Sequence, residues 1–165
     1  MVTFRDIDAD DYPFLREMLY EALFVPEGEA PFPASILDNP DLSKYIVNWG
    51  RHGDFGRIAQ VDGKDVGAAW CRTFTASNKS YGFVDETTPE LTIAILEAHQ
   101  GQGLGTSLIR EVLQLAQVRG HTQVSLSVDK RSRAARLYQR LGFQKVEELD
   151  TAYTMLIGLE KTLRS

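Results

Sequence analysis

The chain has 165 residues, 43% of them apolar, which is the size of one ordinary domain with its own core. Its net charge of -5 argues against a nucleic-acid partner, because phosphate binding normally requires a basic face, and favours a cationic or neutral substrate. Cys71 is the single cysteine, so no intrachain disulfide or cysteine-based zinc site can form, and we expect no metal. No apolar run reaches the roughly 18 residues of a membrane span, and the N-terminus lacks a secretory pattern. We expect one domain over residues 1–165, in the cytoplasm.

The first third of the chain predicts a strand and two helices. Residues 2–6 alternate as a short strand, and apolar side chains recur at helical spacing from residue 14 to about residue 24. Prolines and glycines then interrupt residues 26–33, where neither a helix nor a strand can continue. Residues 42–49 form a second predicted helical region.

A hairpin follows, with strands at residues 55–61 and 64–74. Asp62 and Gly63 lie between them, and this pair supplies the positive φ angles of a type I′ turn. The second strand is apolar on both faces, which predicts burial on both sides. Cys71 is therefore expected to be a small core residue and not a nucleophile.

The second half of the chain alternates strands with helices. A β-branched strand at residues 91–96 leads into a glycine-rich turn, and an apolar stripe from Leu104 predicts a helix that ends before Gly120. Further predicted elements are a strand at 124–128, a basic amphipathic helix that ends at Gly142, and two short strands at 143–149 and 153–159.

The glycine-rich turn has the features of an anion site. The N–H groups of a first helical turn have no helical partner, and glycines let a phosphate approach the backbone. The sequence departs from two nucleotide-binding patterns: Gly105 precedes Thr106 where a P-loop needs lysine, and Gly101-x-Gly103-x-Gly105 is not the Gly-x-Gly-x-x-Gly of a dinucleotide fold. A glycine-rich turn without a ligand is the remaining alternative.

Two motifs resemble those of the GNAT acetyltransferase superfamily. The first resembles motif A and the second motif B, and they read Gln100-x-x-Gly103-x-Gly105 and Ala134-x-x-Leu137-Tyr138-x-x-x-Gly142-Phe143. The resemblance covers nearly the whole chain. It implies an α/β (α+β) domain with a central mixed, twisted sheet of about six to seven strands and about four flanking helices.

The resemblance also implies coenzyme A as the ligand, with its pyrophosphate on the glycine loop and its pantetheine on the preceding strand. The residues expected to bind it are Ile93, Ile95, Leu96, Gln100, Gly101, Gln102, Gly103, Leu104, Gly105, Thr106 and Ser132. The family usually has arginine where this chain has Gln100. Backbone N–H groups and Arg131, Arg133 or Arg136 are then expected to contribute more of the binding.

The implied activity is direct transfer of an acetyl group from acetyl-CoA to a primary amine of a small molecule or peptide. A backbone N–H near Ile95 is expected to stabilise the oxyanion. Glu90 is the first candidate for the general base, with Asp85, Glu86 or water as alternatives, and Tyr138 is the candidate proton donor to the leaving thiolate.

The acceptor pocket is expected to involve aromatic side chains, chosen from Tyr20, Phe24, Trp49, Trp70 and Phe83. We expect no nucleic-acid or membrane partner. The sequence leaves open whether the protein forms a homodimer. Two other classes of function compete with the enzyme: a non-catalytic acyl-CoA sensor or regulatory module, and a structural protein that has kept only the fold.

Overall fold

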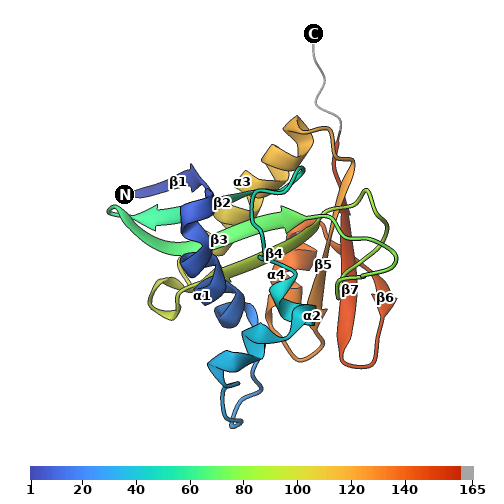
Figure 1. The fold of residues 1–165 in the computed structure, drawn as a ribbon, viewed down its shortest axis with the longest axis horizontal. Coiled ribbons are helices and arrows are strands. Elements are labelled where there is room, and N and C mark those ends of the chain that lie inside the picture. The colour runs from blue at the N-terminus through green and yellow to red at the C-terminus, as the bar shows by residue number, and fades with distance from the viewer. Residues whose placement is uncertain (161–165) are drawn as a thin grey trace.

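In the computed structural model, which describes residues 1–160, seven strands form one mixed sheet in the order β1-β2-β3-β4-β5-β7-β6 (Figure 1). Neighbouring strands are antiparallel except for the parallel pair β4 and β5. The strands are β1 (Val2–Asp6), β2 (Phe55–Val61), β3 (Lys64–Arg72), β4 (Glu90–Ile95), β5 (Gln123–Asp129), β6 (Gln144–Glu148) and β7 (Ala152–Gly158).

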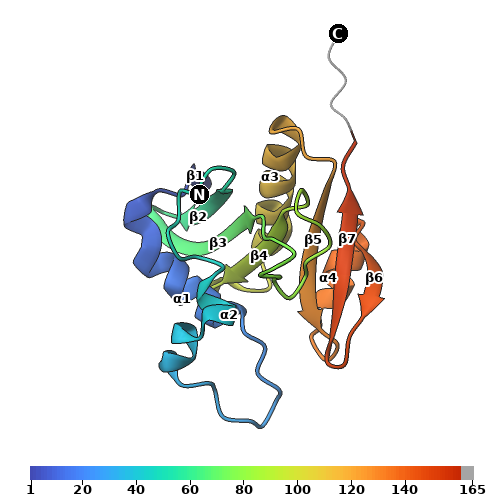
Figure 2. The same ribbon diagram turned by 45° about the vertical axis from the view of Figure 1, so that its right-hand side comes forward.

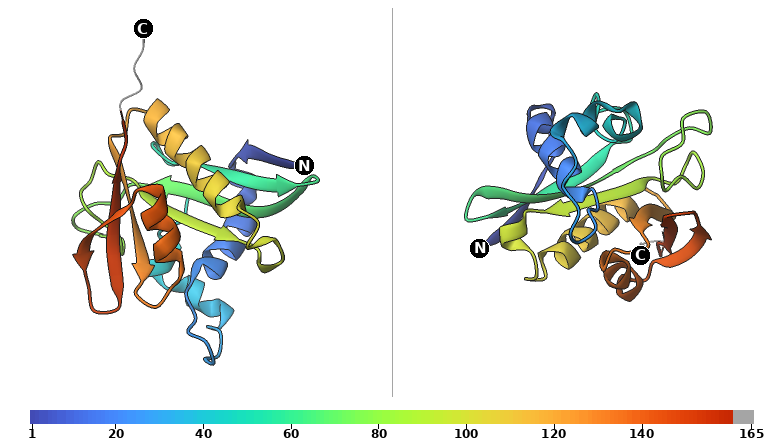
Figure 3. Two further views of the ribbon diagram at one scale, coloured as in Figure 1. Left: turned by 180° about the vertical axis from the view of Figure 1, so that it is seen from behind. Right: turned by 90° about the horizontal axis from the view of Figure 1, so that it is seen from below.

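The helices cover both faces of this sheet, as the view from below in Figure 3 shows. One face carries α1 (Tyr12–Ala22) and the short α2 (Pro40–Ser43), and the other carries α3 (Leu104–Val118) and α4 (Ala134–Leu141). Three 3-10 turns complete the elements: η1 (Ala9–Asp11), η2 (Ala34–Asp38) and η3 (Glu97–His99). The predicted α/β architecture is confirmed. Within residues 1–160, no helix combines the length and apolarity needed to cross a bilayer.

Each face of the sheet has its own hydrophobic core. Leu15 of α1 and Trp70 of β3 belong to one, whereas Leu108 of α3 and Cys71 of β3 belong to the other. Successive side chains of β3 therefore enter opposite cores, and the prediction of a strand buried on both sides is confirmed. Cys71 is 0% exposed, as expected for a core residue.

The hairpin between β2 and β3 has the turn type that its sequence predicts. Asp62 and Gly63 have φ angles of 51° and 83°, as a type I′ turn requires. The predicted helix at residues 42–49 is wrong, because α2 ends at Ser43 and irregular turns follow. Side chains of β3 bind the carbonyl groups of Lys44 and Tyr45, which a continuing helix would have used internally.

The pairing of β4 with β5 holds at one end only. Glu90 and Ser125 are the single registered pair between the two strands. Beyond that point the strands diverge, which can be followed in Figure 2. The gap leaves one side of β4 without a neighbouring strand over most of its length.

Candidate functional site

A cavity of about 1010 Å³ follows the gap between β4 and β5. Its walls come from the whole of β4, from the second half of β5, from the glycine loop, and from the segment after α1. A cavity of this size can hold a ligand larger than most drug molecules.

The glycine loop forms one end of the cavity. Gly101 and Gly103 have φ angles of 78° and 80°, a conformation that other residues rarely adopt, and Gly103 directly precedes α3. In the described chain, none of the six successive backbone N–H groups from Gly101 to Thr106 donates to a protein acceptor. Six free donors at the positive end of a helix of 15 residues make this loop suited to a phosphate or pyrophosphate.

Gln100 connects this loop to the strand before it. Its side-chain Nε2 donates to the carbonyl oxygen of Ile95, the last residue of β4, at 2.9 Å. At the family's usual arginine position, this chain therefore has a neutral side chain that holds the loop against the strand. Phosphate binding has to come from the backbone and from other cations.

The cavity contacts most of the residues expected to bind coenzyme A. Those that line it are Ile93, Ile95, Gln100, Gly101, Gly103, Gly105, Thr106 and Ser132. Leu96, Gln102 and Leu104 do not line it. Leu104 is 7% exposed and belongs to the core beside α3, so only its backbone N–H remains available to a ligand.

The arginines proposed to compensate for Gln100 lie elsewhere. Arg131 pairs with Asp129 at 3.0 Å and stacks on Phe24 at 5.3 Å, and neither Arg133 nor Arg136 lines the cavity. His99 and Arg140 do line it. Neither was predicted, because His99 precedes the first motif and Arg140 occupies a position that the second motif leaves undefined.

Glu90 lies at the other end of β4 and lines the cavity, although it is only 4% exposed. Its carboxylate accepts hydrogen bonds from the hydroxyl of Tyr45 at 2.7 Å, from the N–H of Gly82 at 2.9 Å and from the hydroxyl of Ser80. Burial raises the pKa of Glu90 above its ordinary value, and these hydrogen bonds and the charge of Lys44 oppose part of the rise. No cation among residues 1–160 forms an ion pair with it. A buried carboxylate without a counter-ion is a natural partner for a cationic group.

Asp85 and Glu86 are the alternative bases, and both carboxylates accept hydrogen bonds from their own loop. Asp85 accepts hydrogen bonds from the N–H and hydroxyl groups of Thr87 and Thr88, and Glu86 accepts one from the N–H of Ala76. Those bonds to Thr88 and Thr87 lower the pKa of Asp85. Neither carboxylate lines the cavity.

Tyr138 projects from α4 into the same cavity and is partly buried. Within residues 1–160 no group forms a hydrogen bond with its hydroxyl, and its ring packs edge-on against Phe143 at 6.0 Å. Burial raises the pKa of Tyr138 to about 12. The hydroxyl therefore stays protonated near neutral pH and is free to donate.

The aromatic wall of the cavity differs from the predicted set. Phe24 lines it, but Tyr20, Trp49, Trp70 and Phe83 do not. Trp70 is 0% exposed and belongs to the core. The observed aromatic lining is completed by Phe32, Tyr45 and Tyr81, with Tyr138 from α4. Among the described residues, no cluster of three or more His, Cys, Asp or Glu side chains could hold a metal ion.

The known proteins that this chain resembles are acetyltransferases. The model of the acetyltransferase (GNAT) domain matches residues 53–145. N-acetyltransferase family 8 member 3 of Mus musculus is 42% identical over 73 residues, which are 44% of this chain and 31% of the mouse protein. The match thus spans less than a third of that relative's length.

Two solved structures share the fold over nearly the whole chain. The GNAT domain of S. lividans PAT superposes with a TM-score of 0.71 at 18% identity, covering 96% of this chain and 90% of that one. The acetyltransferase yncA from Salmonella typhimurium, solved with acetyl-CoA, gives a TM-score of 0.69 at 20% identity and covers 100% and 98%. At these identities the likeness establishes the fold.

Proposed function

This chain belongs to the GNAT acetyltransferase family, and on that premise we propose that it transfers an acetyl group from acetyl-CoA to a primary amine. One observation carries the proposal. A single cavity connects the glycine loop, whose free backbone N–H groups suit a pyrophosphate, with the buried carboxylate of Glu90 and the free hydroxyl of Tyr138. A site that only bound the nucleotide would have no use for the last two groups.

The proposed position of acetyl-CoA follows the free backbone groups. The N–H groups of residues 101–106 would hold the pyrophosphate, Arg140 would add positive charge, and His99 could donate a further hydrogen bond. Hydrogen bonds alternate along an antiparallel strand, and the N–H of Leu96 donates to Val66 at 2.9 Å. The N–H groups of Ile93 and Ile95 therefore point away from β3, toward the gap. They are suited to the amides of a pantetheine arm and, at Ile95, to the oxyanion of the thioester.

We propose that Glu90 accepts a proton from the acceptor amine. An alkyl ammonium has a pKa near lysine's value of about 10.4, so it must lose a proton before its nitrogen can attack the thioester carbon. The raised pKa of Glu90 makes its carboxylate a better base than an exposed one, and its lack of a counter-ion favours a cationic acceptor. The proton acquired by Glu90 then passes to solvent.

Tyr138 is proposed to complete the proton balance. When the carbon–sulfur bond breaks, the departing thiolate needs a proton, and the attacking nitrogen must lose its second one. The Tyr138 hydroxyl can protonate the sulfur and be reprotonated from the nitrogen through solvent, because its pKa of about 12 keeps it protonated beforehand.

The apolar part of the cavity lining suggests what the acceptor looks like. Phe24, Phe32, Ile36, Tyr45 and Tyr81 supply an apolar and aromatic surface. This surface suits a primary amine of a small molecule or peptide that carries apolar groups next to its cationic nitrogen. We retain the prediction of a cytoplasmic protein without nucleic-acid or membrane partners.

A binding module without turnover is the second candidate, because the chain departs from the family's usual arginine at Gln100. Two measurements separate the alternatives. Acetyl-CoA should raise the melting midpoint while NADH and ATP at equal concentration do not, since only a ligand of the folded state stabilises it. Thiol release with any amine of a broad panel supports the enzyme, whereas binding without release supports the module.

A further inference from the structure

Arg72 is the last residue of β3 and is completely buried, with 0% of its side chain exposed. Its guanidinium donates through Nε and Nη2 to the two carboxylate oxygens of Asp54 at 3.0 and 2.8 Å. Asp54 is itself 2% exposed and also accepts hydrogen bonds from the N–H groups of Gly50 and Arg51. The pair therefore joins β3 to the turns that precede β2.

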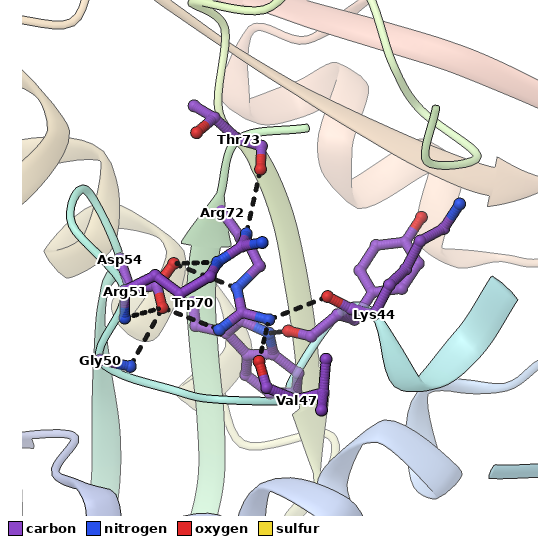
Figure 4. Close-up of polar contacts among 9 residues, drawn as sticks. Lys44, Val47, Gly50, Arg51, Asp54, Trp70, Arg72 and Thr73 are labelled. Carbon is purple, nitrogen blue, oxygen red and sulfur yellow. Dashed lines mark hydrogen bonds and ion pairs between the residues drawn. The ribbon is translucent and has the colours of Figure 1, made fainter. Parts of the chain in front are cut away.

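The third guanidinium nitrogen of Arg72, Nη1, donates hydrogen bonds to backbone carbonyl oxygens. Figure 4 shows Nη1 directed at the carbonyl groups of Lys44 and Val47, at 2.9 and 2.7 Å. Trp70, two residues earlier on the same face of β3, donates its Nε1–H to the carbonyl of Tyr45 at 3.0 Å. Two side chains of β3 thus fix three carbonyl groups of the irregular segment that follows α2.

This segment carries the hydroxyl that contacts Glu90. Tyr45 donates to Oε2 of Glu90 at 2.7 Å and accepts from the N–H of Tyr81 at 2.9 Å. Arg72 lies directly opposite Glu90 in the pairing of β3 with β4. The two side chains form no ion pair, because the guanidinium of Arg72 is already paired with the carboxylate of Asp54. Arg72 can therefore influence Glu90 through the position of Tyr45 instead of by neutralising it.

We propose that Arg72 is a positioning residue of the active site, which fixes the segment at residues 44–47 and so holds the Tyr45 hydroxyl against the Glu90 carboxylate. The inference rests on the proposed function for its catalytic consequence. A guanidinium is suited to this task because its rigid fork can bind a carboxylate and backbone oxygens at once. Lysine would keep the charge but could not satisfy all these acceptors in the same geometry.

The charged and titratable groups around Glu90 define what a test must control. Tyr45 and Lys44 approach it from the segment after α2, and Tyr81 stacks on Tyr45. Arg72 lies opposite it on β3, whereas the neighbouring Cys71 belongs to the core on the other face of the sheet. Arg72→Lys leaves the charge at each of these positions unchanged. A change in Glu90 after that substitution then reports altered geometry and not a lost charge.

The experiment measures the pKa of Glu90 directly, by NMR titration of protein labelled with ¹³C at glutamate side-chain carboxyls, with Glu90→Gln to assign the signal. Loss of the Tyr45 donor destabilises the carboxylate, so Tyr45→Phe should shift this pKa upward. Arg72→Lys should shift it in the same direction and lower turnover by about 10- to 100-fold. In the double variant, Arg72→Lys should add nothing further to either measurement.

Leu108→Ala is the matched control, because it destabilises the domain from the core on the other face of the sheet, which contains none of residues 44–47. It should leave the pKa of Glu90 unchanged. If Arg72→Lys does not fold, Trp70→Phe removes the hydrogen bond to the Tyr45 carbonyl and should give the upward shift. An unchanged pKa in the folded Arg72→Lys protein, or in Trp70→Phe if that one is needed, overturns the proposal. Full turnover of Glu90→Gln would refute the assigned base but not this structural measurement.

Discussion

The two ends of the cavity are built in opposite ways. The glycine loop uses six consecutive residues, and its donors are backbone N–H groups from Gly101 to Thr106. The end around Glu90 gathers partners that lie 45, 10 and 8 residues away in the chain, namely Tyr45, Ser80 and Gly82. A site of the first kind depends on local conformation, whereas one of the second kind depends on the packing of the whole domain.

This contrast predicts different responses to substitution. At the glycine loop, no single side chain can be removed to abolish the donors, so only added bulk or backbone strain will weaken ligand binding. At Glu90, one functional group carries the chemistry, and its loss should affect turnover far more than cofactor binding.

Glu90→Gln should lower kcat by about two to four decades, the usual contribution of a general base, while acetyl-CoA affinity stays near that of the wild type. Glutamine keeps the size of the side chain and removes its basicity. Turnover and cofactor affinity measured on one preparation test this. Glu86→Gln is the matched control, because this acid lies outside the cavity and should leave kcat unchanged. Equal losses in both variants would contradict the assignment.

Tyr138→Phe should lower kcat by about 10- to 1000-fold with little change in binding, since water can partly replace the proton donor. Because the hydroxyl has no hydrogen-bond partner in residues 1–160, the melting midpoint should stay near that of the wild type. If the hydroxyl had a structural role instead, the variant would lose about 0.5 to 1.5 kcal/mol of stability. Calorimetry beside steady-state kinetics distinguishes the two.

Gly105→Ala should weaken acetyl-CoA binding by about tenfold, or about 1.4 kcal/mol, while it stabilises the protein. Gly105 lies in the first turn of α3, and a Cβ there would have Leu137 as its nearest neighbour, at 4.0 Å, so the substitution fits without strain. Alanine in a helix is favoured over glycine by about 1 kcal/mol. Titration calorimetry and thermal melting should therefore move in opposite directions.

Gly103→Val adds bulk at the same end of the cavity, but it also strains the backbone, because Gly103 has a φ angle of 80°. It should weaken binding of coenzyme A and also lower the melting midpoint. Comparison of the two variants separates a blocked phosphate site from a distorted loop. Unchanged affinity in both folded proteins would show that the pyrophosphate binds elsewhere.

Glu90 should also make the stability of the folded protein depend on pH, and this is the smallest of the expected effects. Its pKa is raised in the folded state, so between the unfolded and folded values the folded protein holds more protons than the unfolded chain. Stability contributed by this group is complete below the unfolded value, about 4.3, and falls as pH rises through the folded value. Denaturant unfolding at several pH values should show this fall in the wild type and not in Glu90→Gln.

The sequence predicted the local parts of the molecule best. The hairpin turn at Asp62 and Gly63, the glycine loop and the buried strand of Cys71 each depend on neighbouring residues alone, and the first and last of these predictions are confirmed. The partners of Glu90 could not be predicted, because no local pattern links Tyr45 to a residue on β4. The predicted helix at 42–49 failed for the same reason, since Arg72 and Trp70 bind its carbonyl groups from a distant strand.

Cys71 gives the protein a built-in reporter. It is the single thiol of the chain, it is 0% exposed, and burial raises its pKa, so a thiol reagent cannot reach it while the domain is closed. Thiol released in a turnover assay will therefore come from the cofactor product. Labelling of Cys71 requires β3 to open. The labelling rate therefore measures the free energy of that opening in the unmodified protein. A ligand that binds the closed form should slow the labelling in proportion to its occupancy.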